Sequence, residues 1–238
     1  MLYRKEKMIS QADKQEWMLG LFALVLTCLV LLQLKISCCE ETVKVDRSPQ
    51  VIVIDPGHGG KDPGKIGSDG TMEKTLNLQV AKQLEKLLKK RGYKVVMTRS
   101  KDVTATGEVD SAKTDDLRQR IACTEKAKAS LCVSIHMNSY PEQNPQGAQV
   151  FYYEGNLESR ELAHQIQAGV NEWACPGNRR QESGNSSYYL LKNSFCTTVI
   201  VECGFLSNPL EAAKLHTKNY QKKLAEGICV GILNYFTS

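Results

Sequence analysis

The segment VIVIDPGHGG, Val51 to Gly60, decides how this chain folds. Four β-branched residues run directly into Asp55, Pro56 and a histidine that stands among glycines. A run of β-branched residues is typical of a buried strand, and Asp-Pro-Gly is typical of the turn that ends one. His58 therefore lies on a loop with little side-chain bulk, where it is either incidental to the turn or functional.

The rest of the domain alternates short apolar runs with amphipathic segments. Strands are predicted at 51–55, 93–99, 130–136, 148–153 and 197–205, helices at 73–91, 117–128, 157–173 and 220–236, and loops at 102–116 and 175–187. This rhythm predicts an α/β fold with a largely parallel sheet and helices on both faces. Ligands of such sheets bind at the carboxyl ends of the strands.

An uncharged apolar segment precedes this domain. Residues 17–34 carry no charge, and as a helix they would span about 27 Å, close to the hydrocarbon core of a bilayer. We expect a cytoplasmic segment at 1–16, a membrane-spanning helix or signal segment at 17–36, a linker at 37–50 and the α/β domain at 51–238. Basic residues before the apolar segment then place the domain outside the cytoplasm, either anchored in the membrane or secreted if the segment is cleaved.

Composition excludes two classes of function. The net charge of +5 over 238 residues is modest, and no element carries the clustered basic residues of a nucleic-acid-binding surface. The nine cysteines form no C-x-x-C pair, and most stand in apolar segments, so we expect small core residues and neither a disulfide framework nor a cysteine metal cluster.

Three apolar strands end in a residue capable of chemistry. VIVIDPGH ends in His58, LCVSIH in His136 and VIVE in Glu202. If these strands are parallel neighbours, the three side chains share one edge of the sheet. Glu73 follows His58 after a glycine-rich loop that can fold back towards the strand end.

Two histidines and a carboxylate from separate elements are a common ligand set of catalytic zinc, which lowers the pKa of a bound water to about 7. A second carboxylate beside the ion takes the proton and later donates it to a leaving amine. Glu202 suits that role, because partial burial at the end of an apolar strand raises the pKa of a carboxyl group.

Each residue also has a structural explanation. Glu73 stands at a helix start, where an acid favours the helix dipole. His136 has a backbone carbonyl as an alternative partner, and Glu202 has a buried ion pair with Arg99 or Arg120. The remaining histidines, His164 and His216, lie on charged helices and are expected to be solvated; they are set apart from the predicted site.

Four segments carry a resemblance to a known family. DPGHGGKDPG, MEKTLNLQVAKQL, VSIHMNS and VIVECGFLSN, in that order, resemble the zinc-dependent N-acetylmuramoyl-L-alanine amidases of the bacterial cell wall, over residues 51–238. By position, the resemblance implies zinc ligands at His58, Glu73 and His136 and a catalytic acid/base at Glu202. Met137 is larger than the family's usual residue and is expected to alter the wall of the cleft.

The resemblance implies hydrolysis of the amide between N-acetylmuramic acid and L-alanine in peptidoglycan. The layout of anchor and catalytic domain is similar to the germination-specific amidases of spore formers, which act on spore cortex so that muramic-δ-lactam forms. A vegetative wall amidase is the alternative. Some members of the germination-specific group depend on a lipoprotein partner, so an activating lipoprotein is a possible partner beside peptidoglycan and the membrane.

Two other functions compete with this interpretation. A zinc peptidase of the stem peptide would use similar ligands, but no H-E-x-x-H or H-x-H motif is present. A wall-binding module without activity is disfavoured because all four site positions carry residues of the required type.

Overall fold

The computed structural model describes residues 17–19, 22–27, 50–67 and 69–238. The predicted segments 1–16 and 37–49 and most of the predicted membrane span at 17–36 therefore lie outside the described residues. Within the described part of the chain, no helix combines the length and the apolar character needed to cross a bilayer.

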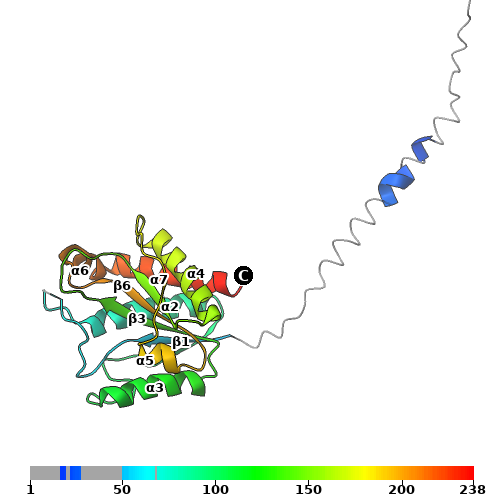
Figure 1. Cartoon of the computed structure of the whole chain (residues 1–238). Helices are drawn as coiled ribbons and strands as arrows, with labels where there is room; N and C mark the ends of the chain where they lie inside the picture. Colours follow the sequence, from blue (N-terminus) through cyan, green and yellow to red (C-terminus); the bar gives the residue numbers. More distant parts are fainter. Residues whose placement is uncertain (1–16, 20–21, 28–49, 68) are drawn as a thin grey trace, which may run out of the picture. The chain divides into compact units, whose positions relative to one another are not determined.

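A six-stranded sheet forms the centre of residues 50–238 (Figure 1). Its strands are β1 (Val51–Pro56), β2 (Lys94–Met97), β3 (Leu131–Asn138), β4 (Gln149–Tyr152), β5 (Ser183–Gly184) and β6 (Thr197–Phe205), in the order β2-β1-β3-β6-β4-β5. β1, β2, β3 and β6 run parallel, as predicted, whereas β4 pairs with β6 antiparallel. The three strands predicted to carry the site, β1, β3 and β6, are direct neighbours.

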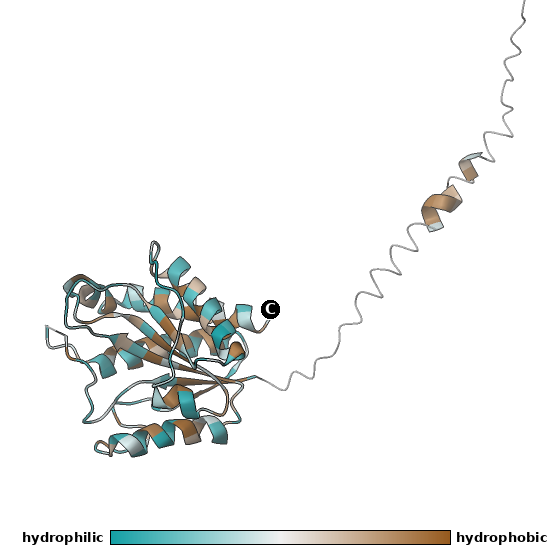
Figure 2. Ribbon diagram, in the orientation of Figure 1, coloured by the Kyte–Doolittle hydropathy of each residue, from teal (hydrophilic) through white to brown (hydrophobic). Residues whose placement is uncertain are grey.

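Helices cover both faces of the sheet, which confirms the predicted layers. One face packs against α2 (Glu73–Lys90), α4 (Leu157–Trp173) and α7 (Lys218–Tyr235), and this layer holds most of the buried aliphatic side chains. The other face packs against α3 (Lys113–Lys126) and the short α5 (Tyr189–Asn193), around a small cluster that includes Ile121 and Ile200. Figure 2 shows largely apolar strands between helices in which hydrophilic and hydrophobic residues alternate.

Glycines set the distance between α4 and α7. A methyl group at Gly169 or Gly227 would overlap the backbone of the facing helix, and one at Gly231 would overlap Ile166. The two helices therefore approach with no side chain between them at these positions, and α7 closes the large apolar layer.

The structure differs from the predicted elements in the short and polar segments. α3 begins at Lys113 instead of 117, because its first turn carries Asp115 and Asp116 and lacks the apolar periodicity used to predict it. α5, α6 (Pro209–Leu215) and β5 were not predicted. α6 had a readable signal, since Asn208 caps it with hydrogen bonds to the backbone N–H groups of Leu210 and Glu211, and proline occupies its first turn.

Candidate metal centre and catalytic carboxylate

Two buried arginines hold the loop that carries His58. Arg99 donates to the carbonyl oxygens of Pro56 and Gly57 at 2.9 Å, and Arg120 donates to those of Pro56 and His58 at 3.0 Å. His58 itself has a φ of 61°, a left-handed backbone conformation that is rare for residues other than glycine. The arginines thus hold the backbone of this glycine-rich turn in a strained conformation.

Glu73 enters the site from the first turn of α2. Its carboxylate is 2% exposed and accepts hydrogen bonds from the backbone N–H groups of Lys65 (2.8 Å) and Met137 (3.2 Å) and from the Asn77 amide (3.2 Å). Its side chain therefore points inward to the end of the sheet, and favourable contact with the helix dipole is not its main role.

The three predicted ligands meet at one point. The Nε2 atom of His58 lies 3.2 Å from Oε2 of Glu73, and Nδ1 of His136 lies 2.9 Å from Oε1 of the same carboxylate. The two imidazole rings stand edge to face with centroids 5.1 Å apart. One donor atom from each residue lies within 4.8 Å of the other two, which is a spacing that a single metal ion can bridge.

Glycines make this convergence possible. A methyl group at Gly57 would overlap the imidazole of His136, and one at Gly64 would overlap the Glu73 carboxylate and the His58 ring. Gly64 also has a φ of 68°, which disfavours any side chain there. The absence of side-chain bulk around His58 is therefore a requirement of the site.

Asp62 supports His58 in a way that suits metal binding. Its Oδ2 lies 2.7 Å from Nδ1 of His58, and its Oδ1 accepts the N–H of Gly64 at 3.0 Å. A carboxylate on Nδ1 places the proton there and leaves the Nε2 lone pair directed at the ligand position, the arrangement usual for metal-bound histidines. The donor set and its support therefore fit a zinc ion.

Charges in the cluster balance one another. Burial raises the pKa of Glu73, but its contacts with His136 and His58 outweigh burial and hold it well below the usual range. Burial lowers the pKa of His58, but Glu73 and Asp62 outweigh this effect and raise it. The carboxylate is thus ionised, as a metal ligand must be.

Glu202 lies beside this cluster on β6, in register with His136 of β3. Burial raises the pKa of Glu202 to about 7. Its Oε2 atom is buried and has no hydrogen-bond partner among the described residues. A carboxyl group with a pKa near neutrality and a free oxygen is suited to accept and donate a proton.

The alternative ion pair of Glu202 with an arginine is wrong. Arg99 is bonded to backbone carbonyls, and Arg120 pairs with Asp55 and, at 2.8 Å, with Asp116. Burial raises the pKa of Asp55, but Arg120 and the hydroxyls of Thr98 and Ser134 outweigh it and lower the pKa. Both arginines therefore hold the backbone around the site, and within the part of the chain that the structure describes neither of them pairs with Glu202.

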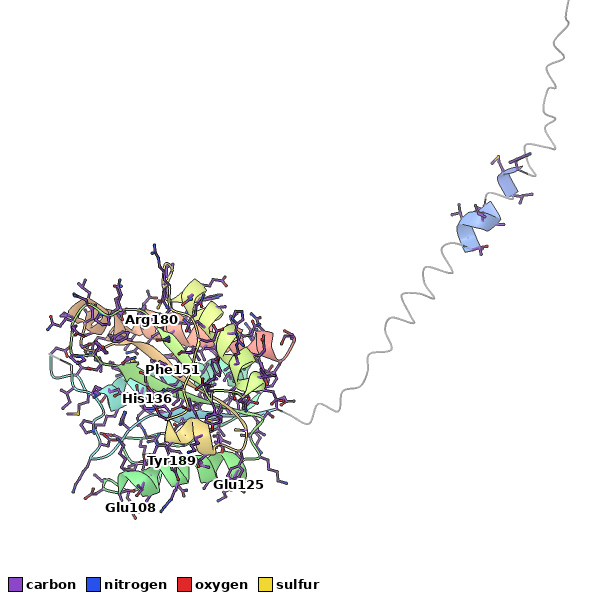
Figure 3. The ribbon with its side chains drawn as sticks, in the orientation of Figure 1. Glu108, Glu125, His136, Phe151, Arg180 and Tyr189 are labelled. Carbon is purple, nitrogen blue, oxygen red and sulfur yellow. The ribbon has the colours of Figure 1, made fainter. Side chains whose placement is uncertain are left out.

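A cavity of about 330 Å³ opens onto these groups. His58, His136 and Glu202 line it together with Arg120 and Lys113 of α3, and a tyrosine pair at the start of α5, Tyr188 and Tyr189, completes the wall. Figure 3 labels His136 and Tyr189, which belong to β3 and α5. A larger cavity of about 820 Å³, lined by residues such as Arg179 and Lys223, contains none of the ligand residues.

The remaining predictions have mixed outcomes. His164 and His216 are solvent-accessible, as expected, and pair with Glu182 and Asp69 at 3.3 and 3.0 Å. The six cysteines of the described residues are free thiols.

The prediction that Met137 alters the wall of the cleft is wrong. Its side chain is 2% exposed and packs in the apolar layer, because neighbouring residues of β3 face opposite sides of the sheet. Asp62 and Asn77 were not predicted to contribute, although Asp62 stands four residues after His58 in the glycine-rich loop.

Comparisons with known proteins agree with this geometry. Residues 52–234 match the family model described as N-acetylmuramoyl-L-alanine amidase. The germination-specific N-acetylmuramoyl-L-alanine amidase of Bacillus subtilis is 38% identical over 194 residues, which cover 80% of this chain and 81% of that protein. LytC of the same organism, also an N-acetylmuramoyl-L-alanine amidase, is 33% identical over 79% of this chain but only 36% of its own length.

The solved structures that resemble this chain are also N-acetylmuramoyl-L-alanine amidases. The CwlD amidase of Clostridioides difficile, determined in complex with the GerS lipoprotein, superposes with a TM-score of 0.73 at 32% identity, over 79% of this chain and 98% of that one. An N-acetylmuramoyl-L-alanine amidase of Clostridium difficile 630 gives 0.70 at 33% identity, over 79% and 97%. The predicted enzyme class is confirmed, and the chain belongs to the N-acetylmuramoyl-L-alanine amidase family.

Proposed function

We propose that this chain hydrolyses the amide between the lactyl group of N-acetylmuramic acid and L-alanine of the stem peptide, with His58, Glu73 and His136 holding a zinc ion and Glu202 as general acid/base. The observation that carries this proposal is the convergence of three donor atoms within 4.8 Å beside a buried carboxyl oxygen that has no partner in the described residues. Zinc, when bound, supplies a Lewis acid that polarises the scissile carbonyl and makes water more acidic.

The chain's own residues account for the proton transfers. Glu202 accepts the proton of the attacking water at its free oxygen and returns it to the nitrogen of the leaving alanine. Its pKa of about 7 makes both transfers feasible near neutral pH. Asp62 keeps the Nδ1 proton on His58, and Asn77 and two backbone N–H groups keep Glu73 ionised and oriented.

Digestion of a defined glycan peptide tests this function. Purified protein with zinc should release intact stem peptide from N-acetylmuramic acid, as detected by mass spectrometry. His58→Ala should lose both activity and zinc, measured by elemental analysis, whereas Glu202→Gln should lose activity and keep zinc. Shortened peptides with the lactyl amide intact would instead identify a zinc peptidase, and glycan binding without bound metal would identify a wall-binding module.

A role in spore cortex is the finer proposal. It is supported by the 38% identity to the germination-specific amidase of B. subtilis and by the similarity to the CwlD amidase. In a spore-forming host, deletion of the gene should remove muramic-δ-lactam from the cortex. Unchanged cortex with altered vegetative muropeptides would favour the alternative role in vegetative cell-wall turnover, for which the similarity to LytC is the support.

A lipoprotein activator and a membrane anchor complete the proposal. The activator is supported by the CwlD structure, which was determined with the GerS lipoprotein. The anchor is supported by the uncharged residues 17–34. Adding a candidate lipoprotein should raise the activity of residues 50–238, and the full chain should remain in the membrane fraction after alkaline extraction while the truncated one does not.

A further inference from the structure

We propose that Lys113 binds a carboxylate of the stem peptide and thereby sets which end of the substrate lies along α3. This inference rests on the proposed amidase function. It concerns substrate binding in the cavity that opens onto the proposed metal centre. Lys113 has no part in the proposed proton transfers.

The charges lining the cavity single out Lys113. Arg120 is buried, and four of its five N–H donors are used on Asp55, Asp116 and two backbone carbonyls. His58 and His136 are bonded to Glu73. Of the cationic side chains lining this cavity, Lys113 alone has no carboxylate within ion-pairing distance among the residues that the structure describes.

Lys113 also lies between two neighbouring cavities. It lines both the 330 Å³ cavity and a smaller one of about 110 Å³, which is enclosed by the loop before α3 and includes Thr104 and Ser111. Lys61 lines the smaller cavity too, but it pairs with Asp110 at 2.6 Å. A group held at Lys113 would therefore bridge the two cavities.

Two carboxylates, those of Asp62 and Asp116, also line this space, and their negative charges would repel a bound anion. Asp62 is bonded to His58 and to the N–H of Gly64, and Asp116 accepts from Arg120 Nε and from the N–H of Ala105. Because each is neutralised or hydrogen-bonded on both oxygens, their remaining repulsion is smaller than their formal charge suggests. Lys113 is exposed, and its charge helps to lower the pKa of Asp62, but among the described residues it forms no direct ion pair with either carboxylate.

Helix stability does not explain a lysine at this position. Lys113 is the first residue of α3, where the helix dipole favours acids and disfavours cations. Asp115 and Asp116 in the same turn follow that preference. A residue that departs from the local rule at the mouth of a site is expected to have a functional reason.

The two halves of the proposed substrate differ in charge, so a cation in the cavity can bind one half and not the other. In a muramoyl peptide the sugars are neutral and the lactyl carboxyl is consumed in the scissile amide, so every carboxylate lies in the peptide half. When the second residue is a γ-linked glutamate, its free α-carboxylate stands one residue beyond the scissile bond. A single fixed cation therefore distinguishes the peptide half from the glycan half.

Two matched muramoyl dipeptides test the proposal, one with this α-carboxylate free and one with it amidated. Binding is measured by calorimetry on zinc-loaded Glu202→Gln protein, which is expected to bind without turnover, and kcat/KM on the active enzyme. Lys113→Met should weaken binding of the free acid about tenfold, as expected for loss of a charge-assisted hydrogen bond, and change binding of the amide less than about twofold. Lys113→Arg should restore most of the affinity for the acid, and Lys126→Met, at the other end of α3, should change neither.

Equal weakening of both dipeptides by Lys113→Met, or no weakening of either, would overturn the proposal. Thermal unfolding of each variant separates loss of recognition from loss of fold. Failure of the proposed function would look different: the active enzyme with zinc would leave both dipeptides uncleaved, and the binding comparison would still decide the role of Lys113.

Discussion

The same strands supply two faces of the sheet that differ in character. On the side of α2, α4 and α7, Ile54, Ile135 and Val201 are fully buried in a continuous apolar layer. One residue further along β1, β3 and β6, the side chains of Asp55, His136 and Glu202 turn to the side of α3 and line the cavity. Because side chains alternate along a strand, residues adjacent in sequence have separate tasks. Most buried aliphatic side chains thus lie on one face, whereas the strand residues of the predicted site line the cavity on the other; Glu73 joins them from the start of α2.

The largest expected effect lies on the cavity face. Glu202→Gln removes the proposed acid/base but keeps the shape of the side chain, so kcat should fall by about 100-fold to 10,000-fold. Zinc content, measured by elemental analysis, should stay at the wild-type level, since the ligands are untouched. Turnover within a few fold of wild type would break the division between the two faces and remove Glu202 from the mechanism.

The matched change on the apolar face is Ile135→Ala, next to His136. Ile135 is fully buried, and its truncation should lower the free energy of unfolding by about 2–5 kcal/mol, as measured by urea denaturation. Activity per folded molecule should remain close to wild type at a temperature well below the unfolding transition. A loss of kcat comparable to that of Glu202→Gln would show that the faces are not separable.

The pH dependence of the free energy of unfolding, compared between wild type and Glu202→Gln, tests whether the Glu202 carboxyl is buried in the folded protein. In the metal-free protein Glu202 has a pKa of about 7, against 4.5 for an ordinary glutamate. Between these values the folded state retains a proton that the unfolded state releases, so this group makes stability fall as pH rises from about 4.5 to 7. Glu202→Gln removes that fall, and its stability relative to wild type should rise by up to about 3 kcal/mol across the window.

Urea denaturation of both proteins in chelator at pH 5 and pH 8 gives this difference. An equal change in the two proteins would mean that the Glu202 carboxyl is solvated in the folded state.

The smallest effect is expected at Asp62, which lines the cavity and supports the proposed metal centre through its contact with His58. Asp62→Asn keeps a hydrogen-bond partner for Nδ1 but removes the charge, so zinc affinity should fall about 10-fold to 100-fold. Competition with a chromophoric chelator measures this affinity. Asp69→Asn, on the same loop but paired with His216, should leave it unchanged.

Much of this arrangement could be predicted from the sequence because it follows from strand ends. The bounds of α4 and β6 match the predicted segments, and apolar strands ending in polar residues located His58, His136 and Glu202. The antiparallel direction of β4 could not be predicted, since the alternation of a strand is the same in both directions. β5 spans two residues and depends on pairing with β4, which no local pattern encodes.

The residues that support the site were harder to identify from the sequence than the proposed ligands. Arg99 and Arg120 are 3% exposed although arginine is usually a surface residue, and their partners are mostly backbone carbonyls distant in sequence. Such contacts depend on how α3 and the loop after β2 fold over the sheet. Asp62 was accessible to sequence reasoning, because an acid in the loop beside a ligand histidine is a common means of orienting the ring.

The hydrogen bonds of Arg120 connect α3 to the loop that carries His58. The guanidinium of Arg120 joins the middle of α3 to the last residues of β1 and to the carbonyl of His58, so that the helix and this proposed metal ligand are directly connected. A displacement of α3 would therefore pull on the backbone of His58 without any group entering the cavity. The position of α3 and the backbone position of His58 are therefore coupled through a single side chain.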